Sequence, residues 1–133
     1  MIHRISILDE NKSALAGEIR LFKEPVSMEC VVDGEKIEVQ ATDYFDCLIV
    51  LREILESRQW LILCNGARYD VYPSPELRKV GLGIKAYRME IGLPAKTEDM
   101  VNILDETEID KIGTIDEQKN YFEEWLQSLE ELT

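Results

Sequence analysis

Histidine and paired cysteines are nearly absent from this sequence. His3 is the only histidine, and Cys30, Cys47 and Cys64 are too widely spaced to form a Cys-x-x-Cys ligand pair. A histidine-based metal site or a catalytic triad therefore lacks its usual side chains. The acidic stretch 105–110 lacks the glycine and the ligand spacing of a calcium-binding EF-hand. We expect three buried thiols, no bound metal, no cofactor and no catalytic residue.

Long apolar stretches are missing as well. The apolar run at residues 60–64 has the length of a strand and no run is longer, whereas a membrane helix needs about 20 apolar residues. The first residues show neither the apolar region nor the cleavage site of a signal peptide. With 45% hydrophobic residues, the 133-residue chain has enough material for a core. We therefore predict one cytoplasmic domain, residues 1–133, with no membrane contact.

Basic residues are scarce, and the charge is distributed unevenly. The 27 acidic residues outnumber the 15 lysines and arginines, so the net charge is −12. Residues 1–63 carry −5, residues 64–96 carry +3 and residues 97–133 carry −10. An acidic surface repels nucleic-acid phosphates, which are bound mainly through cations, and it attracts a basic protein. We expect a protein partner and no nucleic acid; a surface that serves solubility alone is the other interpretation.

The apolar pattern predicts an α+β fold with a mainly antiparallel sheet. Residues 16–23 are expected to form a strand, whereas the first 13 residues show little pattern. Residues 43–58 carry apolar side chains at the i, i+3, i+4 spacing of an amphipathic helix, with Thr42 or Asp43 as its N-cap. We predict that this stretch is one long central helix.

A hairpin is the strongest local prediction. Asp33-Gly34 is typical of a type I′ turn, and a two-residue loop there places Cys30 opposite Ile37. The same register places Met28 opposite Val39, so one face of the hairpin is apolar and the other is polar.

Shorter elements are expected in the second half of the chain. The predictions are a central strand at 60–64, an Asn65-Gly66 turn, a partner strand at 68–72, a short helix from Ser74 to Gly81, a strand at 84–91 and a short helix at 97–104. Thr114 and Glu117 form a capping-box pattern that opens a C-terminal amphipathic helix. Its apolar stripe comprises Tyr121, Phe122, Trp125, Leu126, Leu129 and Leu132.

The segment 64–87 is the candidate binding site, because it combines turn residues, tyrosines and cations in a loop-rich stretch. A phosphate could be cradled by Gly81 and Gly83 together with the nearby cations Arg68, Arg78, Lys79, Lys85 and Arg88. A helix is expected to precede the two glycines, however, so a helix C-cap is the favoured interpretation. The tyrosines and arginines either anchor an interface or pack in the core. The six candidate residues are Asn65, Arg68, Tyr72, Arg78, Lys85 and Tyr87.

One pattern in this segment resembles a known group of proteins. The stretch CNGAR-x-DVYPS at residues 64–74, followed by G-x-G-x-KAY at residues 81–87, is similar to a pattern in small, uncharacterised bacterial proteins. These proteins loosely resemble the immunity proteins of bacterial polymorphic-toxin systems. The resemblance covers roughly residues 60–105 and implies a small, acidic, non-catalytic inhibitor in the cytoplasm. It transfers no inhibitor residues to this sequence.

Three functional hypotheses follow. The leading one is a non-catalytic acidic binding protein, an immunity protein that masks a cognate basic toxin. The second is a small ligand-binding or enzymatic domain with a pocket built from residues 64–87. The third is a structural subunit whose acidic helices mediate assembly. The sequence does not indicate an oligomeric state.

Overall fold

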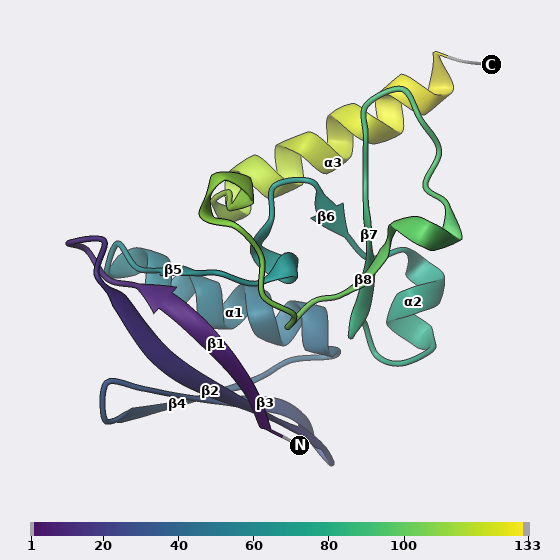
Figure 1. Cartoon of the computed structure of the whole chain (residues 1–133). Helices are drawn as coiled ribbons and strands as arrows, with labels where there is room; N and C mark the ends of the chain where they lie inside the picture. The colour runs from purple at the N-terminus through teal and green to yellow at the C-terminus, as the bar shows by residue number, and fades with distance from the viewer. Residues whose placement is uncertain (1, 132–133) are drawn as a thin grey trace.

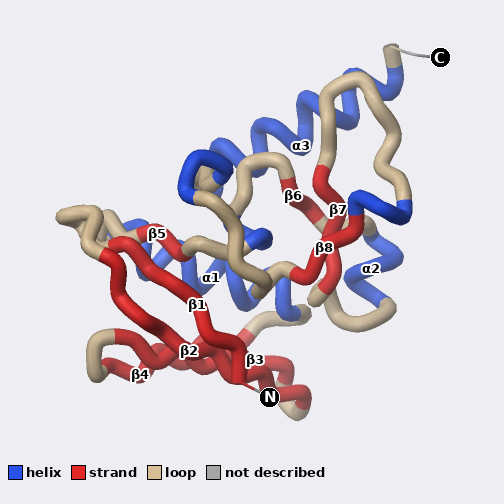
Figure 2. The backbone as a smooth tube through the Cα atoms, viewed as in Figure 1, coloured by secondary structure: helices blue, strands red, loops and turns tan. Residues whose placement is uncertain are grey.

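Two antiparallel sheets and three α-helices form an α+β fold, as the apolar pattern predicts (Figure 1). The computed structural model describes residues 2–131. The larger sheet has the strand order β4-β3-β2-β1-β5, and the smaller sheet has the order β6-β7-β8. Figure 2 shows the strands of the two sheets as separate groups, with helices and loops between and around them. The strands are β1 (Ile2–Leu8), β2 (Ala14–Lys23), β3 (Val26–Val32), β4 (Glu35–Gln40), β5 (Leu61–Ile62), β6 (Val71–Tyr72), β7 (Lys85–Arg88) and β8 (Met100–Asn102). The helices are α1 (Tyr44–Ser57), α2 (Pro75–Lys79) and α3 (Ile115–Glu130), with single 3₁₀ turns η1 (Asn65–Ala67), η2 (Thr97–Asp99) and η3 (Ile109–Lys111).

The β3–β4 hairpin has the predicted turn and register. Asp33 and Gly34 have φ angles of 52° and 75°, which is the left-handed conformation that a type I′ turn requires at both positions. Cys30 pairs with Ile37, and Met28 pairs with Val39. All four of these side chains are buried in the main core, which α1 shares.

The strand β1 was not predicted, and this is a correction to the sequence interpretation. Its residues pair with β2 along their whole length, and Ile7 and Leu8 also pair with β5. Ile5 and Ile7 are buried in the core, whereas Arg4, which precedes Ile5 and points to the other face of the strand, is exposed. The alternation of buried and exposed residues in β1 is too short to predict a strand from the sequence. The strand is determined by its pairing with β2 and β5.

The predicted central strand 60–64 is instead at the edge of the larger sheet. Only Leu61 and Ile62 form β5, and they pair with β1 alone. The opposite side of the stretch is covered by the loop near Thr107, whose N–H donates to the Leu63 carbonyl over 3.3 Å. The segment is apolar because Ile62 and Cys64 are buried in the main core and Trp60 packs against it.

Three further predictions after residue 64 were wrong in part. Asn65-Gly66 lies in a turn as predicted, the 3₁₀ turn η1, but the strand predicted at 68–72 is limited to β6, which pairs with β7 instead of β5. The strand predicted at 84–91 is limited to β7. The helix predicted at 97–104 is the turn η2 followed by β8, because residues 100–102 pair with β7.

The helix caps agree with the sequence. Ser74 Oγ accepts a hydrogen bond from the Leu77 N–H over 3.1 Å and caps α2. Asp43 caps α1 by accepting from the Asp46 N–H over 2.8 Å. Thr114 and Glu117 exchange hydrogen bonds of 3.1 and 2.8 Å, which is the predicted capping box of α3.

The apolar stripe of α3 is only partly covered. Phe122 and Trp125 are half-buried, whereas Leu126 is 43% exposed. Leu132 lies outside the described residues.

The helix α1 has 14 residues and α3 has 16. Within residues 2–131, no helix has both the length and the apolar character that a bilayer crossing demands.

The three cysteines are buried and unpaired, as predicted. Burial raises the pKa of Cys30 to about 11 and that of Cys64 to about 12, so their reactive thiolate forms are rare at neutral pH. We expect iodoacetamide at pH 8 to leave all three thiols unmodified in the folded protein and to alkylate all three in urea. Mass spectrometry gives the count, and rapid alkylation of the folded protein would contradict this burial.

Candidate functional site

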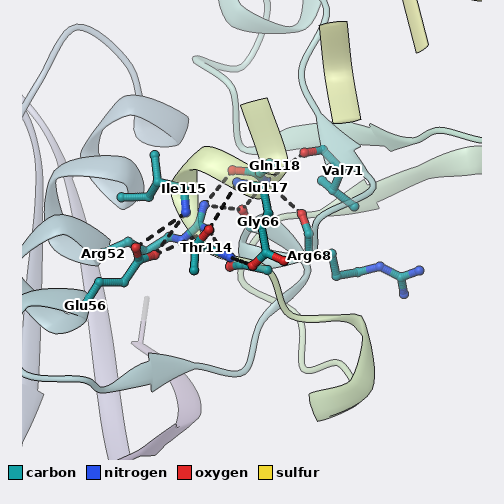
Figure 3. Close-up of polar contacts among 10 residues, drawn as sticks. Arg52, Glu56, Gly66, Arg68, Val71, Thr114, Ile115, Glu117 and Gln118 are labelled. Carbon is teal, nitrogen blue, oxygen red and sulfur yellow. Dashed lines mark hydrogen bonds and ion pairs between the residues drawn. The ribbon is translucent and has the colours of Figure 1, made fainter. Parts of the chain in front are cut away.

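A buried polar cluster joins α1, α3 and the segment 65–71, and thereby positions the candidate site (Figure 3). Its two centres are Arg52 of α1, which is 2% exposed, and Gln118 of α3, which is 0% exposed. Arg52 Nη1 donates to Gln118 Oε1 over 2.6 Å. The same guanidinium donates to the carbonyls of Gly66 and Gly113 over 3.3 and 3.0 Å.

Gln118 holds three backbone carbonyls with one amide group. Its Nε2 lies 2.8 Å from the Gly66 oxygen, 2.9 Å from the Arg68 oxygen and 2.8 Å from the Val71 oxygen. An amide has two N–H groups, so the three acceptors share them. The side chain therefore satisfies the backbone where the chain leaves η1 and enters β6.

Glu56 completes the cluster on the α1 side. Its carboxylate lies 3.8 Å from Arg52 Nη2 and accepts from the Ile115 N–H over 3.2 Å at the start of α3. Burial lowers the pKa of Arg52 and raises the pKa of Glu56, since both charged forms lose water. In residues 2–131 every buried side-chain nitrogen or oxygen has a hydrogen-bond partner, so the cluster leaves no buried side-chain donor or acceptor unpaired.

The smaller sheet divides the predicted site residues between its two faces. Tyr72 pairs with Tyr87, and Lys85 pairs with Asn102, so Tyr72, Tyr87 and Lys85 share one face. Arg88 pairs with Val71 and lies on the opposite face. Of the three, Lys85 is exposed and the two tyrosines are half-buried.

Tyr72 and Arg78 meet in an aromatic cluster. The Tyr72 ring stacks on Phe122 at a centroid distance of 4.0 Å and meets the edge of Phe45 at 5.2 Å. The Arg78 guanidinium lies over both Phe45 and Tyr72, at 5.3 and 5.6 Å from the centroids. Arg78 also bonds Asp43 over 2.8 Å, so it anchors α2 to the N-terminus of α1.

Asn65 and Arg68 lie apart from that cluster, beside the other face. Arg68 forms a two-point contact with Asp70, with distances of 2.8 Å from Nε and 2.9 Å from Nη2. These hydrogen bonds raise the pKa of Arg68. Asn65 Nδ2 donates to the Asn102 carbonyl over 3.2 Å.

Two hollows adjoin on this face. The first, of about 860 Å³, is lined by Asn65, Arg68 and Arg88 among others. The second, of about 560 Å³, contains Tyr69 and Tyr121. The residues common to both hollows are Arg68, Arg88 and Lys111. The structure thus brings two of the six predicted residues into one concavity and gathers the other four on or near the opposite face.

The exposed face of α3 is a second feature of functional interest. Residues 115–131 contain six acidic side chains and one basic one, Lys119. The segment that follows β7 runs beside this helix (Figure 1). It presents Ile91 and Leu93, which are 44% and 48% exposed.

Comparison with known proteins adds no family assignment. No model of a known protein family matches this sequence, and no curated protein matches it.

Sequence reasoning missed Arg52, Gln118 and Lys111. The first two had a visible signal, because each is a polar residue on an otherwise apolar helical stripe. Lys111 had no such signal, since η3 joins the hollow from far along the chain. Among residues 2–131, no group of three or more histidine, cysteine or acidic residues has an arrangement that could hold a metal ion.

Proposed function

We propose that this protein is a non-catalytic binding protein that docks a basic protein partner through α3 and the adjoining loop. The observation that carries the proposal is that α3 and the loop beside it carry both exposed carboxylates and exposed apolar side chains. Glu123 and Glu124 of α3 are exposed, and so is Glu131, the C-cap of the helix. Leu126 on the helix and Leu93 on the loop are 43% and 48% exposed.

The docking surface is already ordered by contacts between the helix and the loop. The Trp125 indole N–H donates to the Leu93 carbonyl over 2.8 Å, and the Gly92 N–H donates to Ser128 Oγ over 2.9 Å. The Tyr121 hydroxyl donates to the Met89 carbonyl over 3.0 Å. A surface that is held in place before binding loses less conformational entropy when it binds.

Charge supports a basic partner. Residues 97–133 carry twelve acidic and two basic side chains, a net −10. Acidic residues around apolar anchors combine fast, charge-steered encounter with a desolvated contact that holds the complex. Basic enzymes such as nucleases match this surface.

The protein class that we propose is an immunity protein that masks a toxin from the same bacterium. The resemblance of residues 64–87 and the acidity of α3 both support this class. Three unpaired cysteines suit the reducing cytoplasm, where such an inhibitor acts. In this proposal α1 is the central helix of a rigid scaffold, and residues 64–87 connect that scaffold to α3.

Co-expression tests this function directly. The probe is the C-terminal domain encoded by the reading frame next to the gene, expressed in a bacterial host with and without this chain. We expect growth arrest by that domain alone, relief of the arrest by this chain, and a 1:1 complex on a sizing column. Absence of a complex with the product of either neighbouring reading frame would contradict the proposal.

A further inference from the structure

Three cations from separate parts of the chain line the larger of the two hollows beside the smaller sheet. Arg68 follows η1, Arg88 ends β7, and Lys111 ends η3. The whole chain has 15 basic residues against 27 acidic ones, so three cations in one concavity depart from its general charge. The acidic residues that line the same hollow are Glu106 and Glu108, and both are exposed.

Arg68 is held with part of its donor capacity unused. Asp70 takes the Nε–H and one Nη2–H, and Thr107 Oγ1 lies 3.3 Å from Nη1. A guanidinium has five N–H groups, so two remain for another acceptor. The Arg68 side chain is only 13% exposed, so its position is set before any ligand arrives.

Arg88 and Lys111 have fixed backbones and uncommitted head groups. The β7 ladder pairs Arg88 with Val71, and the Lys111 carbonyl accepts from the Tyr69 N–H over 3.0 Å. Within residues 2–131, neither of the two charged head groups forms an ion pair or a hydrogen bond. Two unpaired cations beside an oriented arginine favour binding of an anion.

We propose that this hollow binds a small-molecule polyanion with two or more carboxylate or phosphate groups. The fork of Arg68 suits one oxyanion group, and Arg88 and Lys111 supply charge for a second. A hollow of about 860 Å³ is within the usual size of small-ligand sites. None of these three cations belongs to the docking surface proposed above, so the site stands or falls independently of that partner.

Titration of the full-length protein with citrate and with pyrophosphate tests the proposal. Calorimetry and amide NMR shifts are measured at constant ionic strength, set with sodium chloride. We expect saturable 1:1 binding and shifts centred on residues 68, 88 and 111. Binding of citrate alone assigns a carboxylate ligand, binding of pyrophosphate alone assigns a phosphate ligand, and binding of both assigns an oxyanion site of broad scope.

Charge-neutral variants separate a built site from general attraction. Arg88→Gln and Lys111→Gln should each weaken the tighter probe about tenfold, as expected for loss of one charge-assisted contact. Lys79→Gln, an exposed position on α2 outside both hollows, changes net charge equally and should leave affinity within about twofold. Circular dichroism melts confirm that each variant folds. No saturable binding of either probe, or equal weakening by Lys79→Gln, would overturn the site.

Discussion

Replacing Gln118 by Leu is expected to lower the free energy of unfolding by about 3–5 kcal/mol. The change removes the donors that satisfy the carbonyls of Gly66, Arg68 and Val71, and it removes an acceptor from Arg52. Each buried polar group left without a partner costs about 1–3 kcal/mol, and the losses within one network are not additive. Urea unfolding followed by circular dichroism measures the change.

Gln127 provides the matched control on the same helix. It is exposed, so Gln127→Leu should change the unfolding free energy by less than about 0.5 kcal/mol. Arg52→Met should cost about as much as Gln118→Leu, because it leaves Glu56 and two carbonyls without their cation. The double variant should lose much less than the sum of the two. A loss below about 1 kcal/mol for Gln118→Leu would show that the cluster does not hold α3 in place.

Gly66→Ala is expected to destabilise the protein by about 2–3 kcal/mol through overpacking. A Cβ atom at this position would lie 2.4 Å from Leu48 Cδ2 and 2.9 Å from Ile103 Cβ. Both neighbours are fully buried, so neither can move away without disturbing the core.

Gly17→Ala is the control for this substitution. The nearest atoms to a Cβ there are Ile5 Cγ1 and Ile7 Cδ1, both at 3.4 Å, which is ordinary contact. Its cost should stay below about 1 kcal/mol. Equal melting temperatures for the two variants would mean that η1 is not packed tightly against α1 and β8.

The elements that were predictable are those set by neighbouring residues. The turn at Asp33-Gly34, the Ser74 cap and the capping box of α3 each depend on side chains within four positions of one another. The elements that were missed depend on distant partners. β1 acquires its place from β2 and β5, and β8 forms a strand only because β7 lies beside it.

In the candidate site, too, closeness in the sequence did not predict which residues lie together in space. Lys85 and Tyr87 are close in sequence to Arg88, yet strand alternation sends Arg88 to the other face. Tyr72 lies four residues after Arg68 but joins the aromatic cluster with Phe122 instead. Composition indicated correctly that residues 64–96 are richer in cations, but not which of them share a concavity with Lys111.

The most direct test of the proposed docking surface is the kinetics of partner association. Surface plasmon resonance would compare the Glu123→Gln/Glu124→Gln/Glu131→Gln variant with a control variant, Glu24→Gln/Glu38→Gln/Glu53→Gln. All six residues are exposed, and the two variants have the same net charge. We predict that the α3 variant associates about tenfold more slowly at about 50 mM salt, with a flatter salt dependence, while the control keeps most of the native on-rate. Equal on-rates for the two variants would contradict docking through α3.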